Sequence, residues 1–581
     1  MSALQRFAIL IFCAAISAAD GASLQIAITP KFAGEDVQQA SLRYNTSAGE
    51  RFSITRLSYV VSEVALQRSD GSWLEFSNFV AWLDVSQNRN SFYLDKIPAG
   101  EYRSVRYMIG LNSQINHADT AKFAADSPLN PNVNGLHWAW QGGYIFLALE
   151  GLWRNAAGEL DGWSYHLARD GNSPTITLAA PLEITNETKL AIDFDIATLL
   201  NSPRPLSFVR DGSSTHSRDG DPILLALKEN LPGAFSVREV RFISARELSA
   251  VPPKPLYLPK KFTPYPFQMS ANFPVPALPR DNPLISERVA LGEKLFNDTT
   301  LSKDGTISCA SCHQEKAAFS DARRVSAGVE GRLGLRHAMP LFNLAWRNSF
   351  FWDGRAPSLR KQALMPIQDH AEMDENLTNV CARLTANADY TNAFRAAFDP
   401  PEITPEKIGV AIEQFLLTLT SFDSKFDRVL RGAEQFTDPE KRGFHLFSTE
   451  YDPRRGQFGA DCFHCHGGAL FQSQTFANNG LDSEFSDVGR AKITGNKSDE
   501  GKFAVPSLRN VALTGPYMHD GRFKTLEEAV DHYCKGVKRS ATLDPNLAKH
   551  PDGGVPLSKS DQQALVAFLS TLTDSRFALK N

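Results

Sequence analysis

The sequence has little cysteine for its size and almost no excess of either charge. Only 7 of its 581 residues are cysteine, and four of them fall in two identical short motifs, which excludes a fold held together by many disulfides. The formal net charge is -4 and the pI is near 6.4, which excludes a basic nucleic-acid-binding protein. Hydrophobic residues make up 42% and charged residues 22%, so the chain is neither collagen-like nor wholly disordered.

Long hydrophobic runs are missing beyond the first residues. No later segment reaches the roughly 18 apolar residues of a membrane-spanning helix, so we expect a soluble mature protein without stable membrane insertion. Residues 1–19 are typical of an export signal, with Arg6, an apolar run over 7–16 and small residues at 17–19. We therefore expect residues 1–19 to be cleaved, removing Cys13, and the protein to be periplasmic. A buried N-terminal helix is the alternative.

The rest of the chain divides into a β part and an α part. Residues 23–250 alternate apolar and polar positions, as at Leu24, Ile26 and Ile28, and turn signals separate these runs. This pattern predicts an antiparallel β sandwich or barrel-like domain. Residues 251–283 carry ten prolines, which predicts an extended linker.

Beyond the linker the hydrophobic period becomes helical. An apolar stripe over 408–422 follows Thr404-Pro405, which predicts a helix with a threonine cap and a first-turn proline. A second helix is predicted from Thr525, where Glu528 completes a capping box, and a third over 560–572. The C-terminal half is therefore expected to be mainly α.

Two C-x-x-C-H motifs lie in this half. Two cysteines three positions apart can each bond one vinyl group of a haem c, and the following histidine can ligate the iron. We expect two covalently bound haems c, held by Cys309, Cys312, His313, Cys462, Cys465 and His466. The motifs predict two cytochrome c-like lobes, residues 284–440 and 441–581. Zinc binding or redox-active thiols are the alternatives, and His464 inside the second motif is interpreted as a spacer.

Two further strings carry a family resemblance. They are Phe351-Trp352-Asp353-Gly354-Arg355 and Pro516-Tyr517-Met518-His519-Asp520-Gly521-Arg522. With the motifs, they make residues 284–575 similar to the bacterial di-haem cytochrome c peroxidase superfamily, and within it to MauG-type enzymes. The resemblance implies that the first haem reacts with hydrogen peroxide and the second stores an oxidising equivalent. Trp352 stands where the family has a tryptophan between the haems, although alone it would be interpreted as a core residue.

The resemblance also implies a peroxide pocket in the first lobe. Gln362, Pro366 and Glu372 fall at the spacings of the MauG pocket, where a carboxyl and an amide handle protons and hydrogen bonds to peroxide. A solvated helix face is the alternative for each residue. The loop 326–335 lacks the histidine that closes this site in ordinary peroxidases, which implies a permanently open first haem.

Tyr533 stands where MauG-type enzymes have the sixth ligand of the second haem. A phenolate favours higher iron oxidation states than a thioether does. Met518 and His519 are competing ligands on chemical grounds, and a core tyrosine is the plain alternative. For an inter-haem calcium, Thr514 and Pro516 match ligand positions of the family. His337 replaces an asparagine near that ion, which weakens the case for calcium.

The β part resembles another family. The strings are Asn116-His117-Ala118-Asp119, Tyr165-His166-Leu167 and the run from His137 to Phe146 that contains Trp138 and Trp140. They are similar to MbnP, a family of exported copper-binding proteins whose MauG-like partner MbnH oxidises a tryptophan to kynurenine. The chain thus resembles both partners fused, without the cysteines that many MbnP proteins carry in this domain.

The resemblance implies a copper site in the β domain. Imidazoles suit copper, so we expect His117 and His166 as ligands, with His137 as a third. Trp138 and Trp140 face one side of a predicted strand, and either is a candidate for oxidation. Hydrogen-bonded histidines and core tryptophans are the alternatives.

Three functions are compatible with these motifs. The leading hypothesis is a peroxide-dependent di-haem oxidoreductase that oxidises a tryptophan in its own N-terminal domain and matures a copper site. The second is a conventional cytochrome c peroxidase that takes electrons from a small donor protein, and the third is a non-enzymatic electron and copper carrier. Tyr533 and the loop favour the first over the second, and Glu372 with Gln362 weighs against the third. Whether Cys381 and Cys534 form a disulfide is left open.

Overall fold

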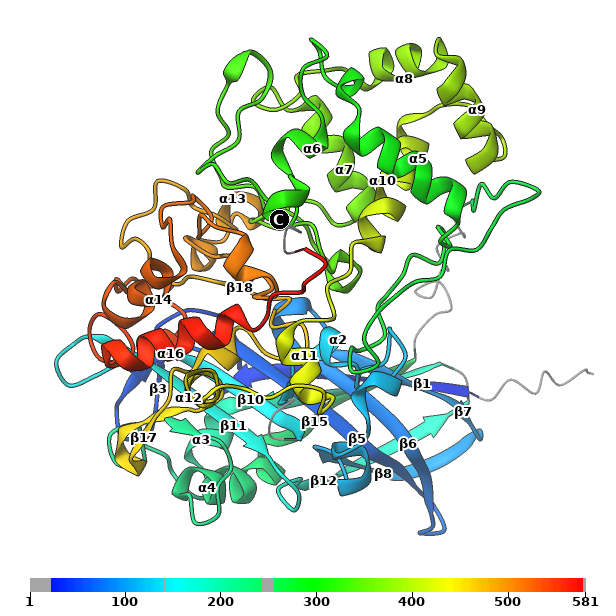
Figure 1. The fold of residues 1–581 in the computed structure, drawn as a ribbon. Coiled ribbons are helices and arrows are strands. Elements are labelled where there is room, and N and C mark those ends of the chain that lie inside the picture. The colour runs from blue at the N-terminus through cyan, green and yellow to red at the C-terminus, as the bar shows by residue number, and fades with distance from the viewer. Residues whose placement is uncertain (1–21, 139–141, 186, 243–254, 578–581) are drawn as a thin grey trace, which may run out of the picture.

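The computed structural model describes residues 22–138, 142–185, 187–242 and 255–577. A β domain formed by residues 22–242 lies beneath a mainly helical region formed by residues 255–577 (Figure 1). The predicted signal peptide falls outside the described residues. Within the described ranges, no helix has both the length and the hydrophobicity needed to cross a membrane.

Two sheets build the β domain. Its main strands are β1 (Ala22–Phe32), β5 (Arg56–Arg68), β6 (Trp73–Asp84), β7 (Ser91–Ile97), β8 (Gly100–Ile109), β10 (Gly143–Arg154), β11 (Leu160–Ala168), β12 (Thr175–Ile184), β13 (Thr188–Asp195) and β15 (Phe235–Phe242). The larger sheet runs β12-β8-β5-β10-β11 and ends at the short β14 (Ser214–Thr215), with β6 also paired to β5. The smaller sheet runs β15-β13-β1, and β7 pairs with β1. The predicted β sandwich or barrel-like domain is therefore confirmed.

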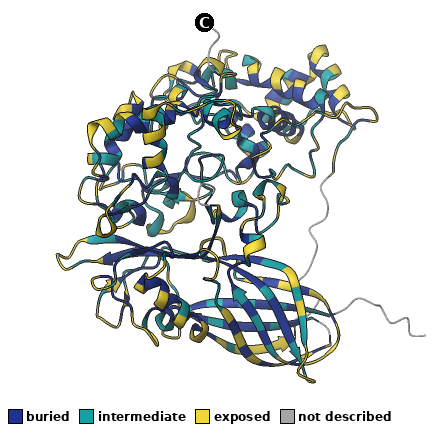
Figure 2. Ribbon diagram, turned by 60° about the horizontal axis from the view of Figure 1, so that its bottom comes forward, coloured by how far each residue is buried: buried dark blue, intermediate teal, exposed yellow. Residues whose placement is uncertain are grey.

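The pairing of β1 with β13 departs from the expected antiparallel pattern. These strands run parallel, with Leu24 opposite Thr188. The apolar alternation predicts that both strands are half-buried but carries no information on their direction. Along β12 every second residue is buried, and Figure 2 shows buried and exposed positions alternating along the strands of this domain.

The helical region contains two lobes of similar construction. The main helices of the first are α5 (Ser286–Asn297), α7 (Leu359–Gln368), α8 (Leu377–Thr385), α9 (Ala388–Ala397) and α10 (Pro405–Thr418), and those of the second are α12 (Asp438–Phe447), α14 (Leu526–Lys535) and α16 (Lys559–Ser570). In each lobe the first helix crosses the last at a glycine. A Cβ atom at Gly292 would lie 2.0 Å from the Ala411 carbonyl oxygen, and one at Gly443 would lie 2.0 Å from that of Ala564. Only glycine permits these two close crossings.

The helix predictions made from caps agree with the structure. Thr404 caps α10 by accepting a hydrogen bond from the backbone N–H of Lys407. Thr525 and Glu528 form the capping box that opens α14. Because caps and first-turn prolines act within a few residues, they can be identified without knowledge of the tertiary fold.

The β domain docks tightly onto the second lobe. At Gly162 of β11, a Cβ atom would lie 1.7 Å from the carbonyl oxygen of Pro545 in α15 (Pro545–Ala548). One hydrophobic core contains Trp138 and Phe146 of the β domain together with Phe463 and Phe568 of the second lobe. The two parts therefore share buried apolar surface, which stabilises their docked arrangement.

The proline-rich connector is in contact with both parts. The side-chain amide of Asn130 donates to the Val275 carbonyl at 2.9 Å, and the Trp346 indole donates to the Pro274 carbonyl at 2.7 Å. Pro274 and Val275 of the connector thus lie between the β domain and the first lobe.

Candidate functional site: two haem cavities and a buried histidine cluster

The first attachment motif begins a short helix, α6 (Cys309–Cys312), which Ser308 caps together with Ser311. His313 follows the helix, and its Nδ1 atom lies 3.1 Å from the carbonyl oxygen of Phe319. That carbonyl can only accept a hydrogen bond, so Nδ1 carries the proton and the Nε2 lone pair is left available for a metal.

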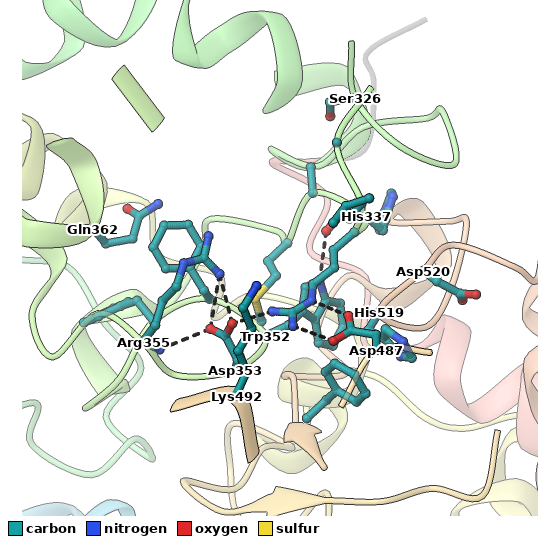
Figure 3. A pocket seen from close by; sticks show the side chains of 18 of the residues that line it. Ser326, His337, Trp352, Asp353, Arg355, Gln362, Asp487, Lys492, His519 and Asp520 are labelled. Carbon is teal, nitrogen blue, oxygen red and sulfur yellow. Dashed lines mark hydrogen bonds and ion pairs between the residues drawn. The ribbon is translucent and has the colours of Figure 1, made fainter. Parts of the chain in front are cut away.

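A cavity of about 830 Å³ opens beside this motif. It is lined by Cys312, His313, Trp352, Gln362, Pro366 and Glu372, among others. Gln362 and Pro366 come from α7, where the proline lies inside the helix. The structure therefore brings all the residues predicted for the peroxide pocket into one cavity, and Figure 3 shows Gln362 and His337 on opposite sides of Trp352.

The carboxyl group of Glu372 has a raised pKa in this cavity. Burial, reinforced by the charge of Asp369, raises the pKa of its carboxyl group to about 7. A group with such a pKa exchanges protons readily near neutral pH, as a general acid or base must. The glutamate predicted from its spacing thus has the electrostatic properties that the role requires.

Ion pairs hold the string that contains Trp352. Arg336 Nη1 lies 2.7 Å from Asp353 Oδ2, and Arg336 Nε lies 2.7 Å from Asp487 Oδ2. Arg355 also contacts Asp353, as the dashed lines in Figure 3 show. These contacts bind the first lobe to the second at the base of the cavity.

The loop 326–335 borders the same cavity. Ser326, Gly334 and Leu335 line it, and Leu335 is 88% exposed. No imidazole of this loop enters the cavity because the segment contains no histidine.

The second motif lies in a tight turn over Cys462–His464. The Nδ1 atom of His466 lies 3.1 Å from the Pro506 carbonyl oxygen, so its Nε2 atom is left available as in the first lobe. Cys462, Cys465 and His466 line a second cavity of about 230 Å³. The repeated arrangement of two thiols, one oriented imidazole and an adjoining cavity fits a covalently bound haem c in each lobe.

Tyr533 and Met518 both line the second cavity. The side-chain amide of Asn479 lies 3.3 Å from Tyr533 Oη and 3.3 Å from Met518 Sδ. Burial raises the pKa of Tyr533 to about 12, so its hydroxyl stays protonated unless a nearby cation favours the phenolate. His519 stacks on Phe503, with ring centroids 3.6 Å apart. The cavity therefore holds both competing ligand types close together.

Trp352 is buried between the two cavities and belongs to the lining of each. His337, Pro340, Asn479, Phe503 and His519 are also shared between the two linings. This is the position that the resemblance implies for Trp352.

The residues considered for calcium have other contacts. The Thr514 hydroxyl donates to the Val511 carbonyl, and the Nε2 atom of His337 lies 3.1 Å from the Ser320 hydroxyl. Thr514 and Pro516 line the second cavity.

A cluster of three histidines lies where the β domain meets the second lobe. His166 comes from β11, His216 follows β14, and His464 is the residue between the two cysteines of the second motif. One ring nitrogen of each lies within 4.8 Å of those of the other two. The sequence pattern did not identify His216 or His464 as ligand candidates. His216 is isolated in a loop, and His464 is interpreted from the sequence as a spacer within the second motif.

Trp138 packs against this cluster. Its ring centroid lies 5.2 Å from that of His216 and 5.9 Å from that of His166, and the side chain is 6% exposed. Trp140, the other candidate for oxidation, lies outside the described residues.

The other predicted copper ligands lie apart from the cluster. His117 is half-exposed, with Nδ1 2.6 Å from the Gly142 carbonyl oxygen and Nε2 3.0 Å from Asp170 Oδ2. His137 packs against Tyr144, and burial lowers the pKa of its imidazole to about 4. Of the three predicted ligands, the structure places only His166 in the cluster. Cys381 and Cys534 are free thiols.

Comparisons with known proteins agree with the division of the chain into a β domain and a helical region. The family model for MbnP matches residues 21–217, and that for di-haem cytochrome c peroxidase matches residues 286–435. Methylamine utilization protein MauG of Methylorubrum extorquens is 38% identical over 51% of this chain and 80% of its own length. Cytochrome c peroxidase Ccp of Escherichia coli is 35% identical over 52% of this chain and 61% of its own length.

A solved structure, that of a MauG-like protein associated with microbial copper homeostasis, is 35% identical, covers 54% of this chain and 98% of its own, and has a TM-score of 0.49. The sequence matches, the two oriented histidines and the paired cavities lead to one conclusion. The chain joins an MbnP domain to a MauG-like region and belongs, through that region, to the di-haem cytochrome c peroxidase family.

Proposed function

We propose that this protein is a peroxide-dependent di-haem oxidoreductase that oxidises Trp138 of its own N-terminal domain to kynurenine and so matures a copper site. The observation that carries the proposal is the contact between Trp138 and His216, in a cluster that includes His464. His464 lies between the two cysteines of the second haem motif. An oxidisable side chain is thus buried beside the haem-binding segment of the enzyme domain.

The first cavity holds the groups that peroxide chemistry needs. Haem c bound there would supply an iron with one face free to accept peroxide. Glu372 takes a proton from the incoming peroxide and returns it to the departing oxygen, because its pKa lies near neutrality. Gln362 orients the peroxide by hydrogen bonding, and Pro366 shapes the wall of the cavity.

Trp352 and Tyr533 connect the first cavity to the substrate side. Trp352 lines both cavities, so its indole is the aromatic group through which electrons cross between lobes. Tyr533 lines the second cavity and would help to hold the haem c of that lobe, which would supply a redox-active iron there. From there the contacts continue through His464 and His216 to Trp138.

The overall reaction balances with peroxide as the oxidant. Two molecules of hydrogen peroxide oxidise the indole to N-formylkynurenine, which gains two oxygen atoms, and two molecules of water are released. Hydrolysis of the formyl group then releases formate and leaves kynurenine. Its aromatic amine and ketone add polar donors beside the histidine cluster. The substrates are therefore peroxide and this tryptophan, and the copper ion is the cargo in an exported, periplasmic protein.

Intact-mass spectrometry of the purified di-haem protein tests the proposal. Peroxide should shift the mass of the wild-type chain by the kynurenine increment. Trp138→Phe should remove the shift, whereas replacement of the partly exposed Trp73 by Phe should leave it unchanged. A wild-type mass that stays constant while the haems turn over peroxide would refute self-oxidation.

A conventional cytochrome c peroxidase is the second candidate. It is favoured by Met518, whose sulfur lies next to the Asn479 amide and would make the ligand set of an ordinary peroxidase. In that case the protein would reduce peroxide steadily with electrons from a small reduced donor protein, and Trp138 would stay unmodified. Steady-state assays with a reduced cytochrome c distinguish the two candidates.

A further inference from the structure

We infer that His464, from the second haem motif, joins His166 and His216 of the β domain to bind one Cu(I) ion across the domain boundary. The inference rests on the proposed function only for the choice of copper, and the three-histidine site itself does not require oxidation of Trp138. It assigns a ligand role to the residue that the sequence presents as a spacer.

The three imidazoles converge on one point. His166 Nδ1 lies 3.3 Å from His216 Nε2, and the His464 ring centroid lies 5.5 Å from that of His216 and 5.9 Å from that of His166. The ligating atoms all lie within 4.8 Å of one another. A cation between them would have three nitrogen neighbours after only small side-chain adjustments, since metal–imidazole bonds are about 2.0 Å long.

His166 is already oriented for coordination. Its Nε2 atom lies 2.9 Å from Glu150 Oε1, and Glu150 is paired in turn with Arg56 at 2.8 Å. The carboxylate accepts the Nε2 proton, which leaves the Nδ1 lone pair facing the other two rings. A carboxylate that orients a ligating histidine in this way is a common feature around metal sites.

His464 has an unused ring nitrogen inside the cluster. Its side chain is 4% exposed, and within the described residues its Nε2 atom makes no hydrogen bond. The nearest carboxylate oxygens are 3.5 Å away on Glu450 and 3.6 Å away on Asp461. A buried polar atom without a hydrogen bond is costly, and a bound cation would supply its missing partner.

The carboxylates of Glu450 and Asp461 form a second group with His464, but they already pair with other side chains, and Glu450 Oε2 lies 2.8 Å from His216 Nε2. Lys549 contacts Glu450, and its Nζ atom lies 3.1 Å from Asp461 Oδ2. The three imidazoles are therefore the better ligand set for a metal. They are borderline donors that suit copper and zinc, whereas carboxylates suit Mg²⁺ or Ca²⁺.

Charge favours a monovalent ion. Glu450 and Asp461 carry two negative charges, Lys549 supplies one positive charge, and the pair of Glu150 with Arg56 is balanced. A Cu(I) ion at the imidazoles would bring one positive charge into this buried site, whereas a divalent ion would bring two. Copper bound there would also link the β domain to the haem-binding turn, so the site would be complete only when the two parts are docked.

Cu(I) titration of the full-length di-haem protein against a competing Cu(I) chelator tests the inference. We expect one tight Cu(I) site in the untreated wild type. We expect the same site in Trp138→Phe, which has no indole at this position to oxidise. His464→Ala and His216→Ala should each weaken binding by at least about 100-fold, because each removes one of three ligands. His117→Ala is the matched control and should bind like wild type. Haem content is measured in every variant, so that loss of haem is not mistaken for loss of copper.

X-ray absorption of the Cu(I)-loaded wild type gives an answer that does not depend on any variant. We expect three histidine nitrogens around copper before peroxide treatment. Two nitrogens, or unchanged Cu(I) affinity in His464→Ala with both haems present, would overturn the assignment of His464. Failure of the proposed self-oxidation would leave both results unchanged, so the two claims fail separately.

Discussion

The indole N–H of Trp352 donates a hydrogen bond to the backbone carbonyl of His337 at 2.8 Å, and both residues line both cavities. The N–H group is the only polar group of the indole, so this bond fixes the orientation of the ring. The backbone N–H of His337 donates in turn to the His519 carbonyl at 2.8 Å. The aromatic group between the lobes is therefore held by segments from each of them.

Trp352→Phe should separate the two haems functionally. Phenylalanine is harder to oxidise, and it leaves the buried His337 carbonyl without its donor, which costs about 1–3 kcal/mol of stability. The first haem should still react with peroxide, but the spectrum of the second should no longer change with it. Stopped-flow absorbance measures both responses. An unchanged response of the second haem would mean that electrons cross between the lobes by another route.

Glu372→Gln should slow the reaction with peroxide by a factor of about 10² to 10⁴, the usual contribution of one general acid–base group. In the wild type, the rate should rise with pH through a midpoint near 7, since only the ionised carboxylate accepts a proton from peroxide. The variant should lack this pH dependence. Glu330→Gln, at an exposed carboxylate, is the matched control. A wild-type profile that is flat between pH 5 and 9 would contradict the role of Glu372.

Tyr533→Phe should change the spectrum of the second haem and leave small-ligand binding at the first haem intact. Met518→Ala should have little effect on either. Electronic and magnetic circular dichroism spectra of the two variants make this comparison directly. The opposite outcome, with Met518→Ala altering the second haem, would support the conventional peroxidase.

Lys549→Met should destabilise the docked second lobe by about 3–5 kcal/mol, because it leaves the buried Glu450 and Asp461 carboxylates without their cation. Lys559→Met serves as its control, since that lysine is exposed and its ion pair contributes little. Denaturant unfolding followed by haem absorbance measures the difference. Equal midpoints for the two variants would show that Lys549 is not needed to balance these charges.

Features that depend on near neighbours in sequence were predictable. The haem motifs place two thiols and an imidazole within five residues, and the caps at Thr404 and Thr525 act over three. The residues of the first cavity came from a family resemblance, because α7 and the segment after it keep a regular spacing from Trp352. Their convergence on one cavity is a property of the folded first lobe.

The histidine cluster was not predictable in the same way. His166 and His216 are 50 positions apart, and His464 belongs to the other part of the chain. No local pattern connects them, since their convergence depends on how β11 docks against the second lobe. His117 and His137 lie in segments with a stronger family resemblance, yet their ring nitrogens and packing are engaged elsewhere.

Peptide mapping after peroxide treatment tests whether the di-haem region oxidises Trp138 of its own chain. We expect kynurenine at Trp138, formed with a first-order rate constant that does not depend on protein concentration, because the two domains of one chain are already docked. Tandem mass spectrometry assigns the modified residue, and a dilution series gives the order of the reaction. An unmodified Trp138 under conditions where the first haem consumes peroxide, or a fraction modified per unit time that rises with protein concentration, would rule out oxidation within the chain.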